Sequence, residues 1–301
     1  MDENNLSMQG KICLVTGSTS GIGEVTAQAL AKKGAKVIIV GRNLERCEST
    51  ITKIRHATGN LAVEYIVADL SSQAEIHKLV EQYKRRYTRL DVLVNDAGGF
   101  FLWRQLSTDG IEMTFALDHL NYFLLSLSLL DILIDSAPSR IVNVASDSHR
   151  GARIDFNNLQ GEKGYFSWKA YGQAKLANVL FTYELARRLE GIPVSVNALH
   201  PGFVATNIGK NNGWLARMFV PFLHLFAISP EEGAETPTYL ASSAEIEGVT
   251  GKYFTRKIAV QSDPASYDIY TASKLWDISA DITGLPREFQ LASEDRVGGG
   301  D

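Results

Sequence analysis

The apolar residues of this chain gather in short continuous runs, each followed by a longer segment with helical periodicity. Runs rich in Val, Ile and Leu are typical of strands buried on both faces, as in parallel sheets. The six runs are Ile12–Thr16, Val37–Val40, Val63–Val67, Val92–Asn95, Ile141–Ala145 and Val194–Leu199. The predicted helices are Ile22–Lys33, Leu44–Thr58, Gln73–Tyr87, Thr108–Ile134 and Trp168–Glu190. This alternation predicts a doubly wound α/β fold, with a mostly parallel seven-stranded sheet and helices on both faces.

Length and composition then limit the class of protein. The 301 residues would allow two domains, but the strand–helix alternation runs along nearly the whole chain and needs only one. We expect that domain over residues 1–286 and a partly disordered tail over 287–301, which ends in VGGGD. The 30 basic and 34 acidic residues form no long run of one sign, which argues against a nucleic-acid partner.

The cysteines and the apolar stretches exclude further classes. Cys13 and Cys47 are too few for a disulfide framework, and no His, Cys and Asp cluster has metal-ligand spacing, so we predict no metal site. The first ten residues are polar, unlike a signal peptide. The apolar stretches 121–134 and 214–228 are shorter than the roughly 20 residues that span a bilayer. We therefore expect no transmembrane anchor and a cytoplasmic protein.

A glycine-rich turn, T-G-S-T-S-G-I-G over residues 16–23, follows the first predicted strand. Glycines permit a tight turn and the close approach of a pyrophosphate, which would rest on the N–H groups at the start of the next helix. The spacing differs from the usual G-x-G-x-x-G, and glycine is also the default turn residue. Its place between the first strand and helix of a Rossmann pattern favours a dinucleotide site. The predicted contacts are Gly17, Ser18, Thr19, Ser20, Gly21, Ile22 and Gly23.

The end of the second strand indicates which dinucleotide is bound. An NAD site typically has an acid there, which accepts hydrogen bonds from the ribose 2′-hydroxyl. This chain has Gly41 and then Arg42, and a guanidinium can bind a 2′-phosphate with two hydrogen bonds. Arg42 could instead be a solvated loop charge, but NADP(H) is favoured over NAD(H), and we place Arg42 and the adjoining Asn43 in the site. After the third strand, Asp69 and Leu70 would meet the adenine, although Asp69 could equally cap the following helix.

A Tyr and a Lys four residues apart share one face of a helix, where the ammonium favours ionisation of the phenol and should lower its pKa. This spacing is common by chance and occurs here three times: Tyr165/Lys169, Tyr171/Lys175 and Tyr270/Lys274. The first pair begins in a predicted loop, and the third lies far along the chain from the cofactor edge. Tyr171/Lys175 opens the helix after the strand that ends near Ser146. Ligands of doubly wound sheets bind beyond the carboxyl ends of strands, so Ser146 and Tyr171 can meet at one carbonyl.

Taken in order, these motifs resemble the short-chain dehydrogenase/reductase family from about Gln9 to Gly284. The matching pieces are Thr16-Gly17-x-x-x-Gly21-Ile22-Gly23, Asn95-x-Ala97-Gly98, Ser146, Tyr171-x-x-x-Lys175 and Pro201-Gly202-x-x-x-Thr206. The segments 158–163 and 175–181 are similar to the retinol-dehydrogenase-like branch. Because no apolar anchor precedes the domain, the chain resembles soluble bacterial members rather than membrane-anchored animal ones.

The resemblance implies a role for each matching residue. Tyr171 would be the general acid in carbonyl reduction, Ser146 would hydrogen-bond the carbonyl oxygen, and Lys175 would hold the nicotinamide ribose and tune Tyr171. Other cofactor contacts would be Asn95, Ala97, Gly98, Pro201, Gly202, Val204 and Thr206. Members of the family often pair their fourth and fifth helices in dimers, here within 108–134 and 168–190, but other branches are monomeric.

Two positions depart from the family pattern. Where the family usually reads Asn-Asn-Ala-Gly, this chain has Asp96 as the second residue, and Asp118 replaces an Asn of the long fourth helix. The resemblance implies that this Asn holds a water of a proton relay, so we count Asp118 with the catalytic residues. A carboxylate near Lys175 could form an ion pair and change how that lysine tunes the phenol. Asn121 could partly substitute for the missing amide.

The substrate side is apolar. The segments 99–103 and 214–228 are rich in Phe, Leu, Met and Trp, which suits a lipophilic alcohol, aldehyde or ketone and a mobile lid over about 207–230. Ordinary packing or an oligomer contact is the alternative interpretation. The leading hypothesis is an NADP(H)-dependent oxidoreductase. The second is an NADPH-binding or interaction protein impaired by Asp96 and Asp118. A nucleotide-sugar epimerase is disfavoured by the glycine spacing.

Overall fold

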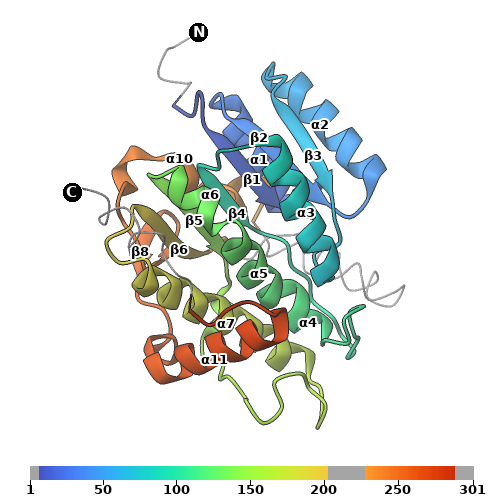
Figure 1. Ribbon diagram of the computed structural model, residues 1–301, viewed down its shortest axis with the longest axis vertical. Coiled ribbons are helices and arrows are strands. Elements are labelled where there is room, and N and C mark those ends of the chain that lie inside the picture. The colour runs from blue at the N-terminus through green and yellow to red at the C-terminus, as the bar shows by residue number, and fades with distance from the viewer. Residues whose placement is uncertain (1–6, 203–227, 289–301) are drawn as a thin grey trace, which may run out of the picture.

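The computed structural model of the 301-residue chain describes residues 7–202 and 228–288. One eight-stranded sheet runs through it, in the order β3-β2-β1-β4-β5-β6-β7-β8 (Figure 1). The strands are β1 (Ile12–Thr16), β2 (Lys36–Gly41), β3 (Val63–Val67), β4 (Val92–Asn95), β5 (Ser139–Val144), β6 (Val194–His200), β7 (Lys252–Thr255) and β8 (Ile258–Val260). Every neighbouring pair is parallel except β7 and β8. The order reverses between β1 and β4, which is the topological switch point of a doubly wound sheet.

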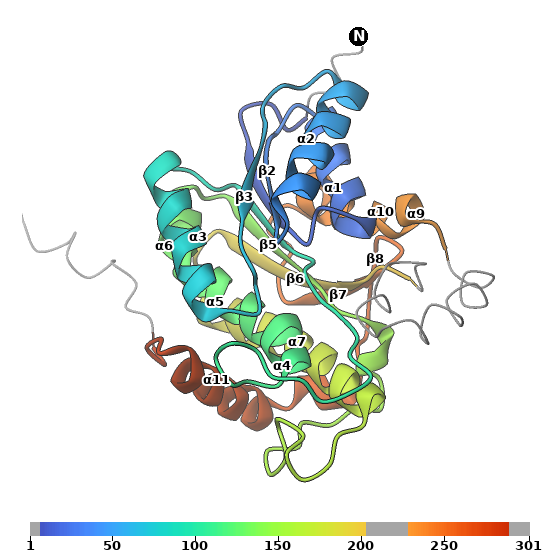
Figure 2. The same ribbon diagram turned by 90° about the vertical axis from the view of Figure 1, so that its right-hand side faces the viewer.

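Helices cover both faces of the sheet, and Figure 2 shows α1, α2 and α10 on one side with α3, α5 and α7 on the other. The helices are α1 (Gly21–Lys32), α2 (Leu44–Thr58), α3 (Gln73–Arg86), α4 (Met113–Phe115), α5 (Asn121–Ser128), α6 (Leu130–Asp135), α7 (Ser167–Arg188), α9 (Pro230–Gly233), α10 (Glu235–Ser242) and α11 (Ile269–Thr283). The predicted fold class is therefore confirmed. The strand count is eight rather than seven, because a short antiparallel edge strand follows β7.

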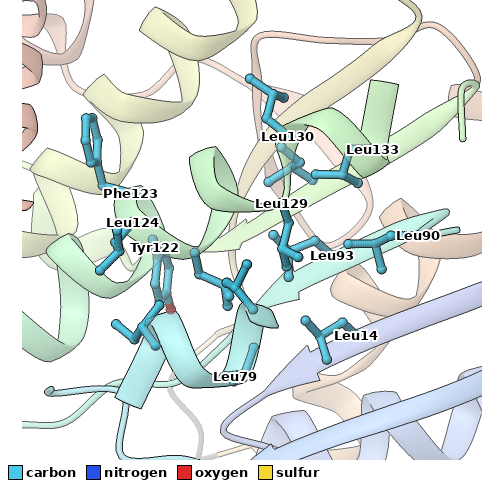
Figure 3. Close-up of a cluster of buried hydrophobic side chains, with 14 of the residues drawn as sticks. Leu14, Leu79, Leu90, Leu93, Tyr122, Phe123, Leu124, Leu129, Leu130 and Leu133 are labelled. Carbon is cyan, nitrogen blue, oxygen red and sulfur yellow. The ribbon is translucent and has the colours of Figure 1, made fainter. Parts of the chain in front are cut away.

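Alternate residues of each strand supply the core on opposite faces of the sheet. Leu14 and Leu93 belong to the cluster under α3, α5 and α7, whereas Cys13 and Val15 pack with α1 and α2 on the other face. Figure 3 shows Leu93 beside Leu90 and beside Leu129, which joins α5 to α6. Because both faces are covered, the strands are continuous apolar runs, as the sequence predicted.

The prediction of one continuous helix over 108–134 is wrong. Residues 108–112 precede any helix, and the rest is divided into α4, a π-helical turn over Ala116–Leu120, α5 and α6. In the wide turn, the carbonyl oxygen of Leu117 accepts a hydrogen bond from the Asn121 amide (2.9 Å), and that of Asp118 accepts one from the Asn178 amide of α7 (2.7 Å). Side-chain amides thus satisfy backbone groups that a regular helix would pair internally.

Candidate active site

The glycine-rich turn lies at the carboxyl end of β1, beside the switch point. Gly17 and Gly21 have φ values of +65° and +62°, which favour glycine. A Cβ atom added to Gly17 would lie 2.8 Å from the Ala97 Cα, and one on Gly23 would lie 2.9 Å from the Gly17 carbonyl oxygen. The turn is therefore packed too closely for larger residues.

The N-terminus of α1 follows this turn. Its N-cap residue Ser20 makes no side-chain capping hydrogen bond. The Gly23 N–H faces the Asp96 carboxyl, so the N–H groups that could bind an anion are those before Gly23 in the first turn. The Ser18 hydroxyl is turned inward, since it donates to the Val15 carbonyl (2.6 Å) and accepts from the Val40 N–H (3.0 Å). The Ser18 N–H also donates to the Val40 carbonyl oxygen (3.3 Å), so Ser18 holds the turn against β2 and its contact with the cofactor stays a prediction.

At the end of β2, Arg42 is exposed and Gly41 is closely packed. A Cβ on Gly41 would lie 2.4 Å from the Thr19 methyl group, so a larger residue at this position would require the Thr19 side chain to move. The Asn43 side chain caps α2 by accepting the Arg46 N–H (2.9 Å). Asn43 therefore has a structural role that the sequence prediction did not include.

After β3, Asp69 accepts hydrogen bonds from the N–H and hydroxyl of Ser71 (2.9 and 2.7 Å). The N-cap of α3 is Ser72 rather than Asp69. Leu70 is 5% exposed and belongs to the core, so its side chain offers little surface to a ligand. The adenine contacts of Asp69 and Leu70 stay predictions.

The segment after β4 is held to the end of β1 by Thr16, whose hydroxyl accepts the N–H groups of Asp96 (2.9 Å) and Ala97 (3.1 Å). Sequence reasoning gave Thr16 no role, although it opens the glycine motif. The Asn95 amide is buried and donates to Ser126 (3.0 Å) and to Asn143 (2.9 Å). Asn95 thus links β4 to α5 and β5 and would shape the site from inside the core.

Ser146, Tyr171 and Lys175 meet at the carboxyl end of β5. The Ser146 side chain faces the Tyr171 hydroxyl and favours its ionised form. The Lys175 Nζ lies 5.4 Å from the centroid of the Tyr171 ring and 3.4 Å from the Val144 carbonyl oxygen. One helical turn of α7 therefore places a phenol and an ammonium beside the end of a buried strand.

The pKa of Tyr171 departs from the sequence expectation. Lys175 does lower it, but burial is the larger effect and raises it, and the carboxylates of Asp118 and Asp96 raise it further. The net direction is upward from the ordinary value, so the expected lowering is wrong for this structure. Burial disfavours the phenolate more than one ammonium stabilises it.

Asp118 lies in the π-helical turn and is completely buried. Its Oδ1 accepts the Gly99 N–H (2.7 Å), and its Oδ2 is 3.4 Å from the Lys175 Nζ. The sequence raised this ion pair as a consequence of the Asn-to-Asp departure, and the structure contains it. The Asn121 side-chain amide instead donates to the Leu117 carbonyl oxygen in the same turn. Its substitution for the missing amide stays a prediction.

The chain is similar to known proteins along most of its length. Residues 11–214 match the family model described as short chain dehydrogenase. The chain belongs to the short-chain dehydrogenase family. It is 38% identical to retinol dehydrogenase 12 of Mus musculus over 287 residues, which cover 94% of this chain and 90% of that protein. Retinol dehydrogenase 14 of Homo sapiens is 40% identical over 297 residues, covering 92% and 88%. This short-chain dehydrogenase falls in the retinol-dehydrogenase-like branch.

Solved structures share the fold of this short-chain dehydrogenase. An uncharacterised protein from Mycobacterium paratuberculosis aligns with a TM-score of 0.76 and 29% identity, covering 94% of this chain and 96% of that one. The Pseudomonas aeruginosa RhlG/NADP active-site complex aligns with a TM-score of 0.65 and 30% identity, covering 83% and 96%. The chain is an oxidoreductase acting on CH–OH groups, and the family binds a nicotinamide cofactor.

His149 supports Ser146 in this short-chain dehydrogenase, and the sequence analysis missed it. The ring is buried, its Nδ1 lies 2.6 Å from the Ser146 carbonyl oxygen, and its Nε2 accepts the Asp263 N–H (3.0 Å). The proton therefore sits on Nδ1 and is donated to Ser146. A histidine three residues after the serine is the only sequence signal, and it does not reveal the Asp263 contact.

The remaining predicted residues are placed as follows. Tyr165 precedes α7, and its hydroxyl donates to the Phe101 carbonyl (2.7 Å), so it fixes the loop after β4. Tyr270 of the third pair is 74% exposed on α11. Gly202 follows Pro201 with φ +97°, and a Cβ there would lie 2.4 Å from the Ile228 side chain. Val204, Thr206 and most of the predicted lid over 207–230 lie outside the described residues.

The loop after β4 places an aromatic wall beside Tyr171. The Phe100 ring is 5.6 Å from the Tyr171 ring and 4.7 Å from the Trp168 ring, and Trp168 is 59% exposed. Phe101 points inward and is 5% exposed, so it is not part of this surface. Within residues 7–202 and 228–288, no helix is long and apolar enough to cross a membrane, and no three His, Cys, Asp or Glu side chains form a metal-binding group.

Proposed function

We propose that this protein is an NADP(H)-dependent oxidoreductase that interconverts lipophilic alcohols with aldehydes or ketones, with Tyr171 as the proton donor and acceptor. The observation that carries the proposal is the meeting of Ser146, Tyr171 and Lys175 beside the glycine-rich turn. The bound dinucleotide supplies or accepts the hydride. Tyr171 would give its phenolic proton to the substrate oxygen in reduction, while Ser146 orients that oxygen by a hydrogen bond.

Replacement of the phenol tests the role of Tyr171. Tyr171→Phe removes the proton donor but keeps the ring, so turnover should fall by about 10²–10⁴-fold while NADPH still binds. Tyr270→Phe is the matched control, because it alters the same Tyr-x-x-x-Lys spacing on the exposed face of α11 and should leave turnover unchanged. Turnover of Tyr171→Phe equal to the parent rate on a panel of aldehydes and ketones would refute the role.

The preference for NADP(H) is supported by the end of β2. Position 41 is a closely packed glycine where a typical NAD site has an acid, and Arg42 is exposed beside it. The RhlG complex with NADP offers an analogy in a relative of the same fold. Arg42→Ala should weaken NADPH binding by roughly 10–100-fold, the usual effect of losing hydrogen bonds to a charged group.

Binding of NADH to Arg42→Ala should change by less than about twofold, because NADH has no 2′-phosphate. Arg85→Ala, at an exposed arginine paired with Glu81 on α3, is the control and should affect neither dinucleotide. Calorimetric Kd values for both dinucleotides measure the preference. An unchanged NADPH/NADH ratio in Arg42→Ala would contradict the assignment.

The lipophilic substrate is supported by the aromatic wall of Phe100 and Trp168 beside Tyr171. The homodimer through the 108–134 and 168–190 segments stays a prediction, and within one chain α11 already packs along α7 (Figure 1). The cytoplasmic location and the domain limit at residue 286 stay predictions as well.

The alternative function, a dinucleotide-binding protein with impaired turnover, is favoured by the Asp118–Lys175 ion pair. It predicts NADPH binding without turnover on the same panel of aldehydes and ketones.

A further inference from the structure

The ammonium of Lys175 is shared between two groups that can carry negative charge. Its Nζ is 3.4 Å from the Asp118 Oδ2 on one side, and 5.4 Å from the centroid of the Tyr171 ring on the other. The side chain is 5% exposed and that of Asp118 is fully buried, so water screens this pair weakly. A charge on Asp118 therefore acts on the same ammonium that stabilises the Tyr171 phenolate.

The backbone fixes Asp118 in this position. Its Oδ1 accepts the Gly99 N–H, its carbonyl oxygen accepts the Asn178 amide, and the π-helical turn sets the direction of the side chain. A Cβ added to Gly98 would lie 3.3 Å from both carboxylate oxygens, so the loop after β4 closes over the group. The carboxylate cannot turn away from Lys175 without losing these contacts.

We propose that Asp118 is a positioning residue that acts through Lys175 to keep Tyr171 protonated to higher pH, which sets the site for proton donation and hence for carbonyl reduction. The inference rests on the proposed function of Tyr171. In the reductive step, the phenolic O–H bond would break as the O–H bond of the product alcohol forms, and a bound reduced dinucleotide would supply the hydride that the carbonyl carbon gains. Solvent then returns the proton to the phenolate.

Charged and titratable groups face this cluster from several elements. Asp96 follows β4, Glu112 precedes α4, Tyr122 lies on α5 and Tyr165 precedes α7, and each interacts electrostatically with members of the cluster. His119, next to Asp118, faces Asn178 and Ser279 instead, and burial lowers its pKa to about 4, so it is neutral near pH 7.

The charge of Asp118 is present where Tyr171 titrates. Burial raises the pKa of Asp118 to about 6, although Lys175 and the Gly99 N–H lower it in part. Asp118 is therefore mostly ionised at pH 7 and above. A neutral amide at this position would remove one of the negative charges that compete for the ammonium, and the phenolate would form at lower pH.

The test compares the pH dependence of the parent protein and Asp118→Asn, which keeps the shape and the acceptor for Gly99. In kcat/KM profiles, the acidic limb of alcohol oxidation and the basic limb of carbonyl reduction should both move down by about one pH unit in the variant. Asp131→Asn, at an exposed acid paired with Lys84, is the matched control and should move neither limb. A loss of rate with unmoved limbs would overturn the proposal, because it is what a purely structural role predicts.

A second readout does not depend on turnover. In protein labelled with ¹³C at the tyrosine ring, the Tyr171 resonance, identified by its absence in Tyr171→Phe, should titrate at lower pH in Asp118→Asn than in the parent. Equal titration in the two proteins would overturn the proposal even if neither were active. Asp118→Ser serves if Asp118→Asn does not fold. Full turnover of Tyr171→Phe, by contrast, would refute the proposed function and not this coupling.

Discussion

The half-buried acid Asp96 should make the stability of this protein fall as the pH rises from about 4 to about 7. Its backbone N–H is fixed by Thr16, and its Oδ2 lies where a Cβ on Gly23 would approach to 2.7 Å, so the carboxyl is held between β4 and the start of α1. Burial raises the pKa of Asp96 to about 7, with Lys175 and the Gly23 N–H opposing the rise. In the unfolded chain an aspartate titrates near about 3.9.

The sign and size follow from linkage. Between pH 4 and 7 the folded state keeps a proton that the unfolded state has lost, so each rise in pH favours unfolding. A pKa difference of about three units corresponds to about 4 kcal/mol at most, at about 1.4 kcal/mol per unit. The Asp96 residue is partly exposed, and solvent screening reduces this value, so we expect about 2 kcal/mol.

Asp96→Asn removes the titrating group and retains its shape. Urea unfolding of both proteins at pH 4, 5, 6, 7 and 8 measures the effect. The free energy of unfolding of the variant minus that of the parent should grow by about 2 kcal/mol between pH 4 and pH 8. Asp131→Asn should follow the parent at every pH. Parallel curves for Asp96→Asn and the parent would refute the argument that the fold holds Asp96 in its protonated form.

Two further predictions concern packing around the site. Gly172→Ala would place a Cβ 2.8 Å from the Ser148 carbonyl oxygen, and the Ser148 N–H donates to the Ser146 hydroxyl. We therefore expect the free energy of unfolding to fall by about 1–2 kcal/mol and turnover to be lower. An unchanged or raised free energy of unfolding would contradict this. Phe100→Ala should raise KM about tenfold for long-chain or aromatic aldehydes and leave it unchanged for acetaldehyde, and an equal rise for both would count against the aromatic wall.

Most of the sheet could be predicted from the sequence because its strands are buried on both faces. The runs over Ile12–Thr16, Val63–Val67 and Val92–Asn95 match β1, β3 and β4 at both ends. The edge strand β8 carries no such signal, since all three of its residues are exposed. The turn before it uses Arg256 and Lys257 with positive φ, where glycine or asparagine would have marked a hairpin.

The break in the 108–134 helix could not be predicted, because the reason for it lies elsewhere in the chain. The segment is apolar on nearly every side, so its periodicity shows no interruption. The π-helical turn depends on the Asn178 amide of α7, some 60 positions later, which binds the Asp118 carbonyl. Sequence reasoning identified Asp118 as a departure but could not show that it would be buried against Lys175.

Asp96 and Asp118 differ from the asparagines expected at these positions in charge but hardly in shape. Aspartate and asparagine have nearly the same size, so Asp96 and Asp118 fit the turns that the family fold provides, and the Ser146–Tyr171–Lys175 arrangement is retained. Both carboxylates face Lys175, which lowers the pKa of each while burial raises it. Because burial raises the pKa of both acids toward neutral pH, the electrostatic field at the phenol changes as the pH crosses that range. The reaction class therefore follows from membership of the family, whereas under the proposed function the pH range of proton donation by Tyr171 would follow from two atoms that differ between an amide and an acid.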